Sequence, residues 1–179
     1  MHPGTEPTDH LDPVDPVGVV DPGVFRRTVG RFPTGICVVT TRDAGIDHAM
    51  TVNSFSSVSL DPLLVLICVE LEARFHDAVI AAGFWGVSIL DGGGRAVADW
   101  LATRGRPLHG QLDRAPHRRG PATGVALLSS ATGTLECRTE AVHPGGDHSI
   151  VVGAVVSAQM SEEAESALVY HRGTYKRLD

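Results

Sequence analysis

Short apolar runs of strand length, separated by turn-rich breaks, constrain the fold of this chain more than any other feature. Runs such as "LLVLICVEL", "FWGVSIL" and "HSIVVGAVVSAQ" recur from about residue 34 to the C-terminus, and the stretches with helical spacing are short. Strands joined by turns, with only short helices, favour an antiparallel sheet that closes into a barrel. We therefore expect a fold that is mainly β with short helices.

Size and charge limit the classes of partner. With 179 residues the chain is about one domain long, and its formal net charge is −6 without a basic block that could follow a phosphate backbone. Nucleic acid is therefore not an expected partner. The longest apolar runs are much shorter than the ~20 residues of a membrane helix, and no apolar stretch follows a positively charged start. We expect no membrane contact and a cytoplasmic location.

The chain divides into a tail and one domain. Residues 1–20 are rich in Pro, Asp and Gly and lack apolar periodicity, so they are predicted to be a flexible tail. The domain is expected to cover residues 21–179. It begins with a short helix that Asp21 caps, that carries apolar residues such as Phe25 on one face, and that Pro33 ends.

The cysteines and histidines do not suggest a metal site. Cys37, Cys68 and Cys137 sit in apolar or strand-like runs without a CxxC pair, which predicts small buried hydrophobic side chains. The nine histidines are scattered, and no Cys/His group has the spacing of metal ligands. No bound metal is therefore expected.

The stretch "TVNSFSSVSLDPLLVLIC", Thr51 to Cys68, places small hydrogen-bonding side chains directly before an aliphatic run. In a half-buried strand, Thr51, Asn53 and Phe55 would share one side. Two interpretations stay open. Serine and threonine on a barrel rim can bond to nearby backbone, or the strand end can present neutral donors to a flat heterocycle with a phosphate tail. In the second, Arg74 at the start of the next helix meets the phosphate.

A tight turn in "PGGDHSIVVGAV" places His148 at the start of another apolar strand. The glycines of this turn are typical of a hairpin, so His148 is either a residue of the rim or a hydrogen-bonding group that points into a site. In the second interpretation its imidazole contacts a substrate amide or a pyrophosphate. The glycines of "DGGGRAVADW" lack the GxGxxG spacing of a dinucleotide fingerprint, and no GxSxG elbow is present.

The segment 105–124 carries too many Gly, Pro and Arg residues for a regular element, so we expect a long excursion over the surface or over a partner. The arginines in and beside it also leave two interpretations open. They form a solvated loop, or Arg104, Arg106 or Arg118 meets a pyrophosphate or a 2′-phosphate.

Together these segments resemble the flavin reductase family, whose members have an FMN-binding split barrel and serve as small components of two-component flavin-dependent monooxygenases. The resemblance runs from about Val24 to Leu178. It is carried by "FRRTVGRFPTGICVVTT", "HAMTVNSFSSVSLDPLLVLICV", "FWGVSIL", "GTLECRTEAVHPGGDHSIVVGAVV" and "LVYHRGTY". It implies a split β-barrel of the FMN-binding type.

The resemblance also implies a set of site residues. His148 matches the histidine of the family's Gly-Asp-His motif and is the expected contact of the nicotinamide nucleotide. The backbone at Cys68 and Val69 is expected to close one side of the flavin. The implied flavin-site residues are Thr51, Asn53, Ser54, Phe55, Ser56, Ser57, Cys68, Val69, Arg74, Tyr170 and Tyr175.

The activity that the resemblance implies is hydride transfer from NADH or NADPH to FMN or FAD. A homodimer and a separate flavin-dependent monooxygenase that receives the reduced flavin are the implied partners. Three alternatives remain at this point. They are a relative that uses a deazaflavin or resembles pyridoxamine-phosphate oxidase, a non-enzymatic flavin- or haem-binding barrel that acts as carrier or sensor, and a structural dimer module.

Overall fold

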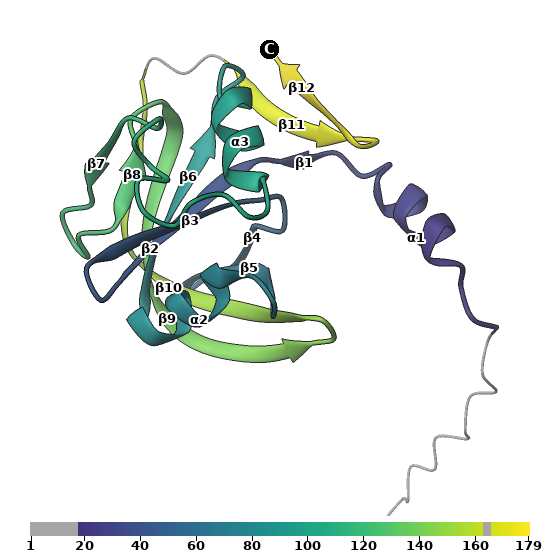
Figure 1. The fold of residues 1–179 in the computed structure, drawn as a ribbon, viewed down its shortest axis with the longest axis horizontal. Helices are drawn as coiled ribbons and strands as arrows, with labels where there is room; N and C mark the ends of the chain where they lie inside the picture. Colours follow the sequence, from purple (N-terminus) through teal and green to yellow (C-terminus); the bar gives the residue numbers. More distant parts are fainter. Residues whose placement is uncertain (1–17, 163–165) are drawn as a thin grey trace, which may run out of the picture.

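The computed structural model describes residues 18–162 and 166–179, and most of the predicted flexible tail, residues 1–20, lies outside these ranges. Three short helices and twelve strands form within them (Figure 1). In chain order they are α1 (Pro22–Val29), β1 (Thr34–Gly35), β2 (Cys37–Asp43), β3 (Ile46–Val52), β4 (Ser56–Leu60), β5 (Leu63–Glu70), α2 (Arg74–Ala82), β6 (Phe84–Leu90), α3 (Arg95–Ala102), β7 (His117–Arg119), β8 (Ala126–Leu128), β9 (Ala131–Gly145), β10 (His148–Met160), β11 (Ala167–His171) and β12 (Thr174–Leu178).

A seven-stranded antiparallel sheet forms the body of the protein. Its strand order is β3-β2-β6-β9-β10-β5-β4, and a three-stranded sheet β1-β11-β12 and a hairpin β7-β8 accompany it. The two edge strands, β3 and β4, do not pair with each other in the described chain, so the prediction of a closed barrel is wrong. The predicted mainly β fold is confirmed, and the open edge fits the split barrel that the resemblance implies.

The residues between β3 and β4 interrupt a strand that the sequence predicts. The sequence predicts one strand through "HAMTVNSFSSV", but the ladder stops at Val52 and resumes at Ser56. The three residues between them, 53–55, carry the chain from one edge of the sheet to the other. The alternation of side chains between the two faces of the strand therefore ends at Val52.

Two apolar cores pack against opposite faces of β2. Val38 belongs to the core that α3 covers, whereas Cys37 and Val39 belong to the core that α2 covers. Alternate residues of a strand point to opposite sides, so an unbroken apolar run is what this position requires. In the second core the Trp85 ring lies so close to Gly153 that a Cβ there would come within 2.5 Å of ring carbon Cζ2.

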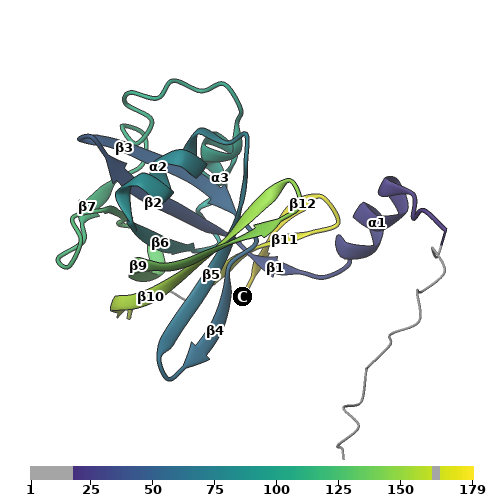
Figure 2. The same ribbon diagram turned by 90° about the horizontal axis from the view of Figure 1, so that it is seen from below.

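Helix α1 differs from the expectation in its environment. Asp21 caps it as predicted, because its carboxylate accepts a hydrogen bond of 2.8 Å from the backbone N–H of Val24. The helix ends at Val29, before Pro33, and none of its residues is buried. Phe25 is 59 % exposed, and α1 stands away from the sheets (Figure 2). The apolar face that the sequence predicts therefore has no partner within the described chain.

The segment 105–124 is more ordered than expected. It contains strand β7, which pairs with β8, so the prediction that it holds no regular element is wrong there. Gln111, Leu112 and Ala115 are buried, and the latter two belong to the core beside α3. Glycine and proline set the turns, but these side chains hold the segment against the body.

Glu136 on β9 fixes the loop that joins β7 to β8. Its carboxylate is 1 % exposed and accepts hydrogen bonds from the backbone N–H groups of Ala122 (3.1 Å) and Thr123 (2.7 Å) and from the Thr123 hydroxyl (2.6 Å). Burial would raise the pKa of Glu136, but bonds from Thr123, Ala122 and Ser157 outweigh it and lower the pKa. Gly120 passes so close that any Cβ would overlap this carboxylate.

We expect Glu136→Gln to lower the free energy of unfolding at neutral pH by about 2 kcal/mol, because the amide leaves buried donors unpaired. The pKa of the carboxyl is lower in the folded than in the unfolded chain. The carboxylate therefore stabilises the fold fully at a pH above the ordinary Glu pKa. This contribution is lost as the pH falls through the lower pKa of the folded protein. Denaturant unfolding of both proteins at several pH values measures this. The exposed Glu140→Gln serves as control. A difference that stays constant down to acid pH would contradict the assignment.

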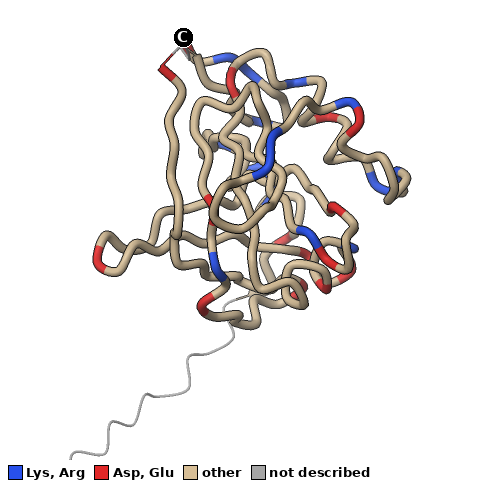
Figure 3. The backbone as a smooth tube through the Cα atoms, turned by 90° about the vertical axis from the view of Figure 1, so that its left-hand side faces the viewer, with Lys and Arg blue, Asp and Glu red and all other residues tan. Residues whose placement is uncertain are grey.

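Two of the three cysteines behave as predicted. Cys37 and Cys137 are buried, and burial raises the pKa of each thiol to about 12. Cys68 is half-buried. Within residues 18–162 and 166–179, no group of three or more His, Cys, Asp and Glu side chains is arranged to hold a metal ion, and no helix could cross a membrane. Acidic and basic residues are interspersed along the chain (Figure 3).

Candidate functional site

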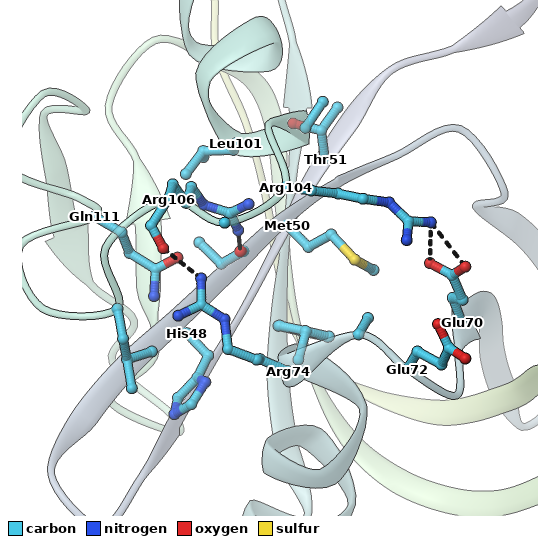
Figure 4. A pocket seen from close by; sticks show the side chains of 16 residues that line it. His48, Met50, Thr51, Glu70, Glu72, Arg74, Leu101, Arg104, Arg106 and Gln111 are labelled. Atoms are coloured by element: carbon cyan, nitrogen blue, oxygen red, sulfur yellow. Dashed lines mark hydrogen bonds and ion pairs between the residues drawn. The ribbon is translucent and has the colours of Figure 1, made fainter.

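A cavity of about 460 Å³ opens between β3, the β5–α2 junction and the loop after α3. Its walls come from His48–Thr51, from residues between Glu70 and Phe75, and from residues between Leu101 and Gln111 (Figure 4). This volume lies in the range of small-molecule sites, which measure roughly 300–1,000 Å³.

The N-terminus of α2 lies in the cavity wall. Its N-cap residue is Ala73, which offers no side-chain oxygen to the first N–H groups of the helix. Serine, threonine, aspartate or asparagine usually fills this position. An uncapped helix N-terminus favours an anion, because free N–H groups and the helix dipole both attract negative charge. At its other end α2 closes at Gly83, which adopts the left-handed conformation.

Two arginines without a carboxylate partner line the cavity beside this helix end. Nη2 of Arg74 donates to the carbonyl oxygen of Arg106 (2.5 Å), and Arg106 donates to the carbonyl oxygens of Thr103 (2.9 Å) and Ala49. No acidic side chain pairs with either arginine among the described residues. Burial lowers the pKa of Arg106, and the neighbouring Arg74 lowers it further. This end of the cavity therefore carries uncompensated positive charge.

His48 on β3 lies in the same wall (Figure 4). Burial lowers the pKa of its imidazole, and the nearby Arg74 adds to that effect while Asp43 opposes it. The neutral form is therefore favoured, and His48 contributes a neutral polar group next to the arginines.

The opposite end of the cavity carries an ion pair. Nη2 of Arg104 lies 2.8 and 2.7 Å from the two carboxylate oxygens of Glu70. Glu70 ends β5 and stands opposite His148, the first residue of β10. Nδ1 of His148 lies 2.7 Å from Asp147, and this hydrogen bond lowers the pKa of the aspartate. His148 is therefore at the rim, one strand away from the cavity wall.

A second contact ties β10 to α2. Nε2 of His76 lies 2.9 Å from the hydroxyl of Ser149, and its Nδ1 lies 2.9 Å from Asp77. Ser149 is 6 % exposed and does not line the cavity, so this arrangement holds the two elements together and offers no accessible nucleophile. It fixes the position of His148, the residue before Ser149, relative to the N-terminal end of α2.

The residues predicted for the flavin and the nicotinamide nucleotide lie in several places. Thr51 and Arg74 line the cavity, and His148 stands at its rim. The polar stretch lies along the crossing between the two sheet edges and the start of β4, and Cys68 and Val69 are in β5 next to it. The residues of that stretch are Asn53, Ser54, Phe55, Ser56 and Ser57.

Several of these polar side chains already bond to the protein. The Thr51 hydroxyl donates to the carbonyl oxygen of Ala98 (2.9 Å), and the Ser54 hydroxyl both donates to and accepts from the backbone of Cys68 (3.1 and 3.0 Å). These are the bonds expected if small polar side chains on the rim bond to nearby backbone. The Ser54 bonds hold the crossing residues 53–55 against β5. The side chain of Val69 is fully buried, so only its backbone could contact a ligand.

The two predicted tyrosines lie together but apart from the cavity. Tyr170 and Tyr175 are cross-strand partners in β11 and β12, with ring centroids 5.3 Å apart in an edge-to-face arrangement. Both pack against the core beneath α3, and burial raises the pKa of Tyr175. Asn53 is linked to this group, because its amide donates to the hydroxyl of Thr34, the partner of Tyr170 in the ladder.

Of the arginines proposed from the sequence, Arg104 and Arg106 line the cavity, whereas Arg118 bonds Thr134 and Gln159 on another surface. Sequence reasoning missed His48 and Glu70 among the cavity residues. The signal for His48 was weak, a lone histidine in a strand.

Comparison with known proteins decides between the alternatives. The family model described as "Flavin reductase like domain" matches residues 29–179. The chain belongs to the flavin reductase family. This confirms the resemblance seen in the sequence and its implied class of enzyme, and it agrees with the split-barrel architecture.

Relatives in this family match most of the chain. The NADH-dependent FMN reductase AsuE2 of Streptomyces nodosus subsp. asukaensis is 41 % identical over 157 residues, which cover 86 % of this chain and 83 % of the relative. The NADH-dependent FAD reductase of Streptomyces globisporus is 36 % identical over 173 residues, 96 % and 91 % of the two chains.

Solved structures in this family share the fold. BorF, the flavin reductase component of a bacterial two-component tryptophan halogenase, has a TM-score of 0.83 at 41 % identity and covers 88 % of this chain and 98 % of its own. The NADH:FAD oxidoreductase SgcE6 of Streptomyces globisporus, solved with NAD and FAD fragments, has a TM-score of 0.83 at 35 % identity, over 90 % and 97 % of the chains.

Proposed function

We propose that this protein is an NAD(P)H-dependent flavin reductase that binds the phosphate of FMN or FAD at the N-terminus of α2. The observation that carries the site assignment is the uncapped helix end at Ala73 beside Arg74, which has no carboxylate partner in the described chain. An alkyl phosphate satisfies both features, since it accepts from backbone N–H groups and from a guanidinium. Relatives named as NADH-dependent FMN and FAD reductases support the activity.

Each side chain has a role that its position supports. Arg74 and the first turn of α2 hold the phosphate, and Arg106 keeps the loop after α3 against β3 through its bond to Ala49. The crossing segment and the backbone at Cys68 form the border along which the flavin ring lies. Bound flavin supplies the chemistry, because its ring accepts a hydride from the nicotinamide. The protein orients both molecules and needs no acid or nucleophile of its own.

His148 is proposed to hydrogen-bond the nicotinamide nucleotide. Its side chain is 41 % exposed and is held by Asp147 on one nitrogen, and Nε2 has no partner among the described residues and can face a ligand. Its place opposite Glu70, at the end of β5, brings it next to the cavity mouth. The tyrosine pair is proposed to support the flavin side of the barrel through Asn53.

Binding of flavins with and without a phosphate tests this site. We expect the fluorescence of FMN to be quenched when the protein is added. FMN should bind more tightly than riboflavin, which lacks the phosphate. FAD reports whether a second phosphate and the adenosine are tolerated. Equal affinity for FMN and riboflavin would contradict a phosphate site at α2, whereas absence of any flavin binding would contradict the function.

A homodimer is the second part of the proposal. Val24, Phe25 and Val29 expose an apolar face on α1, and Leu60 at the tip of the β4–β5 hairpin is 86 % exposed. Exposed apolar surface of this kind is usually covered by a partner. A second copy of the chain is the partner that the family resemblance implies. We expect a particle of about twice 18.9 kDa.

Substituting the α1 face tests the dimer. Phe25→Asp should shift the mass measured by light scattering from dimer to monomer, because it places a charge in the proposed interface. Arg42→Asp, which alters an exposed residue on β2, is a control that should stay dimeric. A wild-type monomer at micromolar concentration would contradict the dimer.

Delivery of reduced flavin to a separate oxygenase is the third part. It is supported by relatives such as the reductase component of 4-hydroxyphenylacetate 3-monooxygenase of Thermus thermophilus, 35 % identical over 86 % of this chain, and by BorF. The expected cytoplasmic location stays a prediction.

A further inference from the structure

Arg104 occupies the border between the cavity and the rim residue His148. It lies just after α3, and its side chain extends past Met50 toward Glu70 (Figure 4). Glu70 in turn is the cross-strand partner of His148, and the N–H of Leu71 donates to the carbonyl oxygen of Asp147 (3.0 Å). A ligand that reaches from His148 into the cavity therefore passes the guanidinium of Arg104.

The ion pair that holds Arg104 is easily exchanged. The side chain of Arg104 is 79 % exposed and that of Glu70 is 33 % exposed. Exposed pairs contribute little to stability. Nη2 makes both contacts with Glu70, and the other nitrogens of the guanidinium have no partner among the described residues. Its remaining N–H groups match the paired oxygens of a diphosphate.

We propose that Arg104 exchanges Glu70 for the diphosphate of the nicotinamide dinucleotide and thereby sets the affinity for the hydride donor. The inference rests on the proposed function, in which the nicotinamide approaches the flavin next to His148. FAD also carries a diphosphate, so the chemistry is shared by two ligands. With FMN as the flavin, only the dinucleotide carries one.

The test compares Arg104→Ala with wild type in steady-state kinetics with FMN. We expect the KM for NADH to rise roughly tenfold, because a charge-assisted contact to the dinucleotide is lost, while kcat and the Kd for FMN stay unchanged. With reduced nicotinamide mononucleotide, which has no diphosphate, the two proteins should have the same KM. Arg95→Ala removes an arginine from a different exposed ion pair, with Asp99, and should match wild type throughout.

A titration of NADH fluorescence measures the same difference as a Kd and needs no turnover. Equal NADH affinity of Arg104→Ala and wild type would overturn the inference without touching the proposed function. An Arg104→Ala protein that binds FAD more weakly but NADH normally would assign the contact to the flavin instead, and would also overturn it.

Glu70→Gln gives an independent test in the opposite direction. Because it removes the competing carboxylate, it should lower the KM for NADH by about two- to fivefold, which corresponds to the small free energy of an exposed pair. A rise in this KM would mean that the intact pair is what the dinucleotide recognises, and would contradict the exchange.

Discussion

Arg74→Ala should weaken FMN binding by at least about tenfold, because a charge-assisted hydrogen bond to the phosphate is lost. Riboflavin binding should stay close to that of wild type, since riboflavin has no phosphate. Arg74 is exposed and, among the described residues, donates only to the carbonyl oxygen of Arg106, so little effect on folding is expected. Fluorescence quenching titrations with both flavins measure the two affinities.

The control for Arg74 is Arg138→Ala, which removes an exposed arginine that pairs with Glu140 on β9. It should bind FMN like wild type, with an unchanged melting temperature. If Arg74→Ala bound FMN as tightly as wild type, the phosphate would lie elsewhere and the assignment of the α2 end would be wrong.

His148→Ala should raise the KM for NADH by about tenfold, the equivalent of one lost hydrogen bond of ~1.4 kcal/mol, while flavin affinity stays near wild type. A higher KM for NADH with an unchanged flavin affinity distinguishes a lost dinucleotide contact from a general disturbance of the hairpin. His143→Ala alters an exposed residue of the same hairpin, opposite Ile150, and should leave both values unchanged. Unchanged kinetics in His148→Ala would remove the residue from the site.

Elements whose signals are local could be predicted from the sequence. A helix that begins at Arg74 was expected, and it ends where Gly83 adopts the left-handed conformation. The strand "FWGVSIL" is β6 with the expected bounds, and Asp21 caps the helix as expected of an aspartate at this position. For the Asp21 cap and the end of α2, the determining interaction lies within a few residues along the chain, whereas the apolar run of β6 marks a buried strand without identifying its partners.

Features that depend on contacts between distant segments could not be predicted in this way. The break at residues 53–55 follows from the edge-to-edge crossing of the sheet, which no local pattern encodes, and so a single strand was expected there. Burial of Gln111 likewise depends on its amide reaching the carbonyl oxygen of Asp47, 64 residues away. Turn composition indicated the loop but not what it covers.

The candidate site was predicted in part. Arg74 and Thr51, two of the implied flavin contacts, line the cavity, and so does Arg106, one of several arginines considered from the sequence. The pairing of Arg104 with Glu70 joins residues 34 positions apart and appears only once β5 and α3 are packed. Tyr170, which the resemblance places near the same pocket, does not line this cavity and packs against the core beneath α3.

The central claim is tested most directly by following NADH oxidation optically with purified protein and FMN, FAD or no added flavin. The account predicts turnover that saturates with added flavin, which would also identify the preferred flavin, and a parallel series with NADPH would identify the donor. Flavin binding without any oxidation of NADH or NADPH would contradict a reductase and would leave a flavin carrier or sensor as the function.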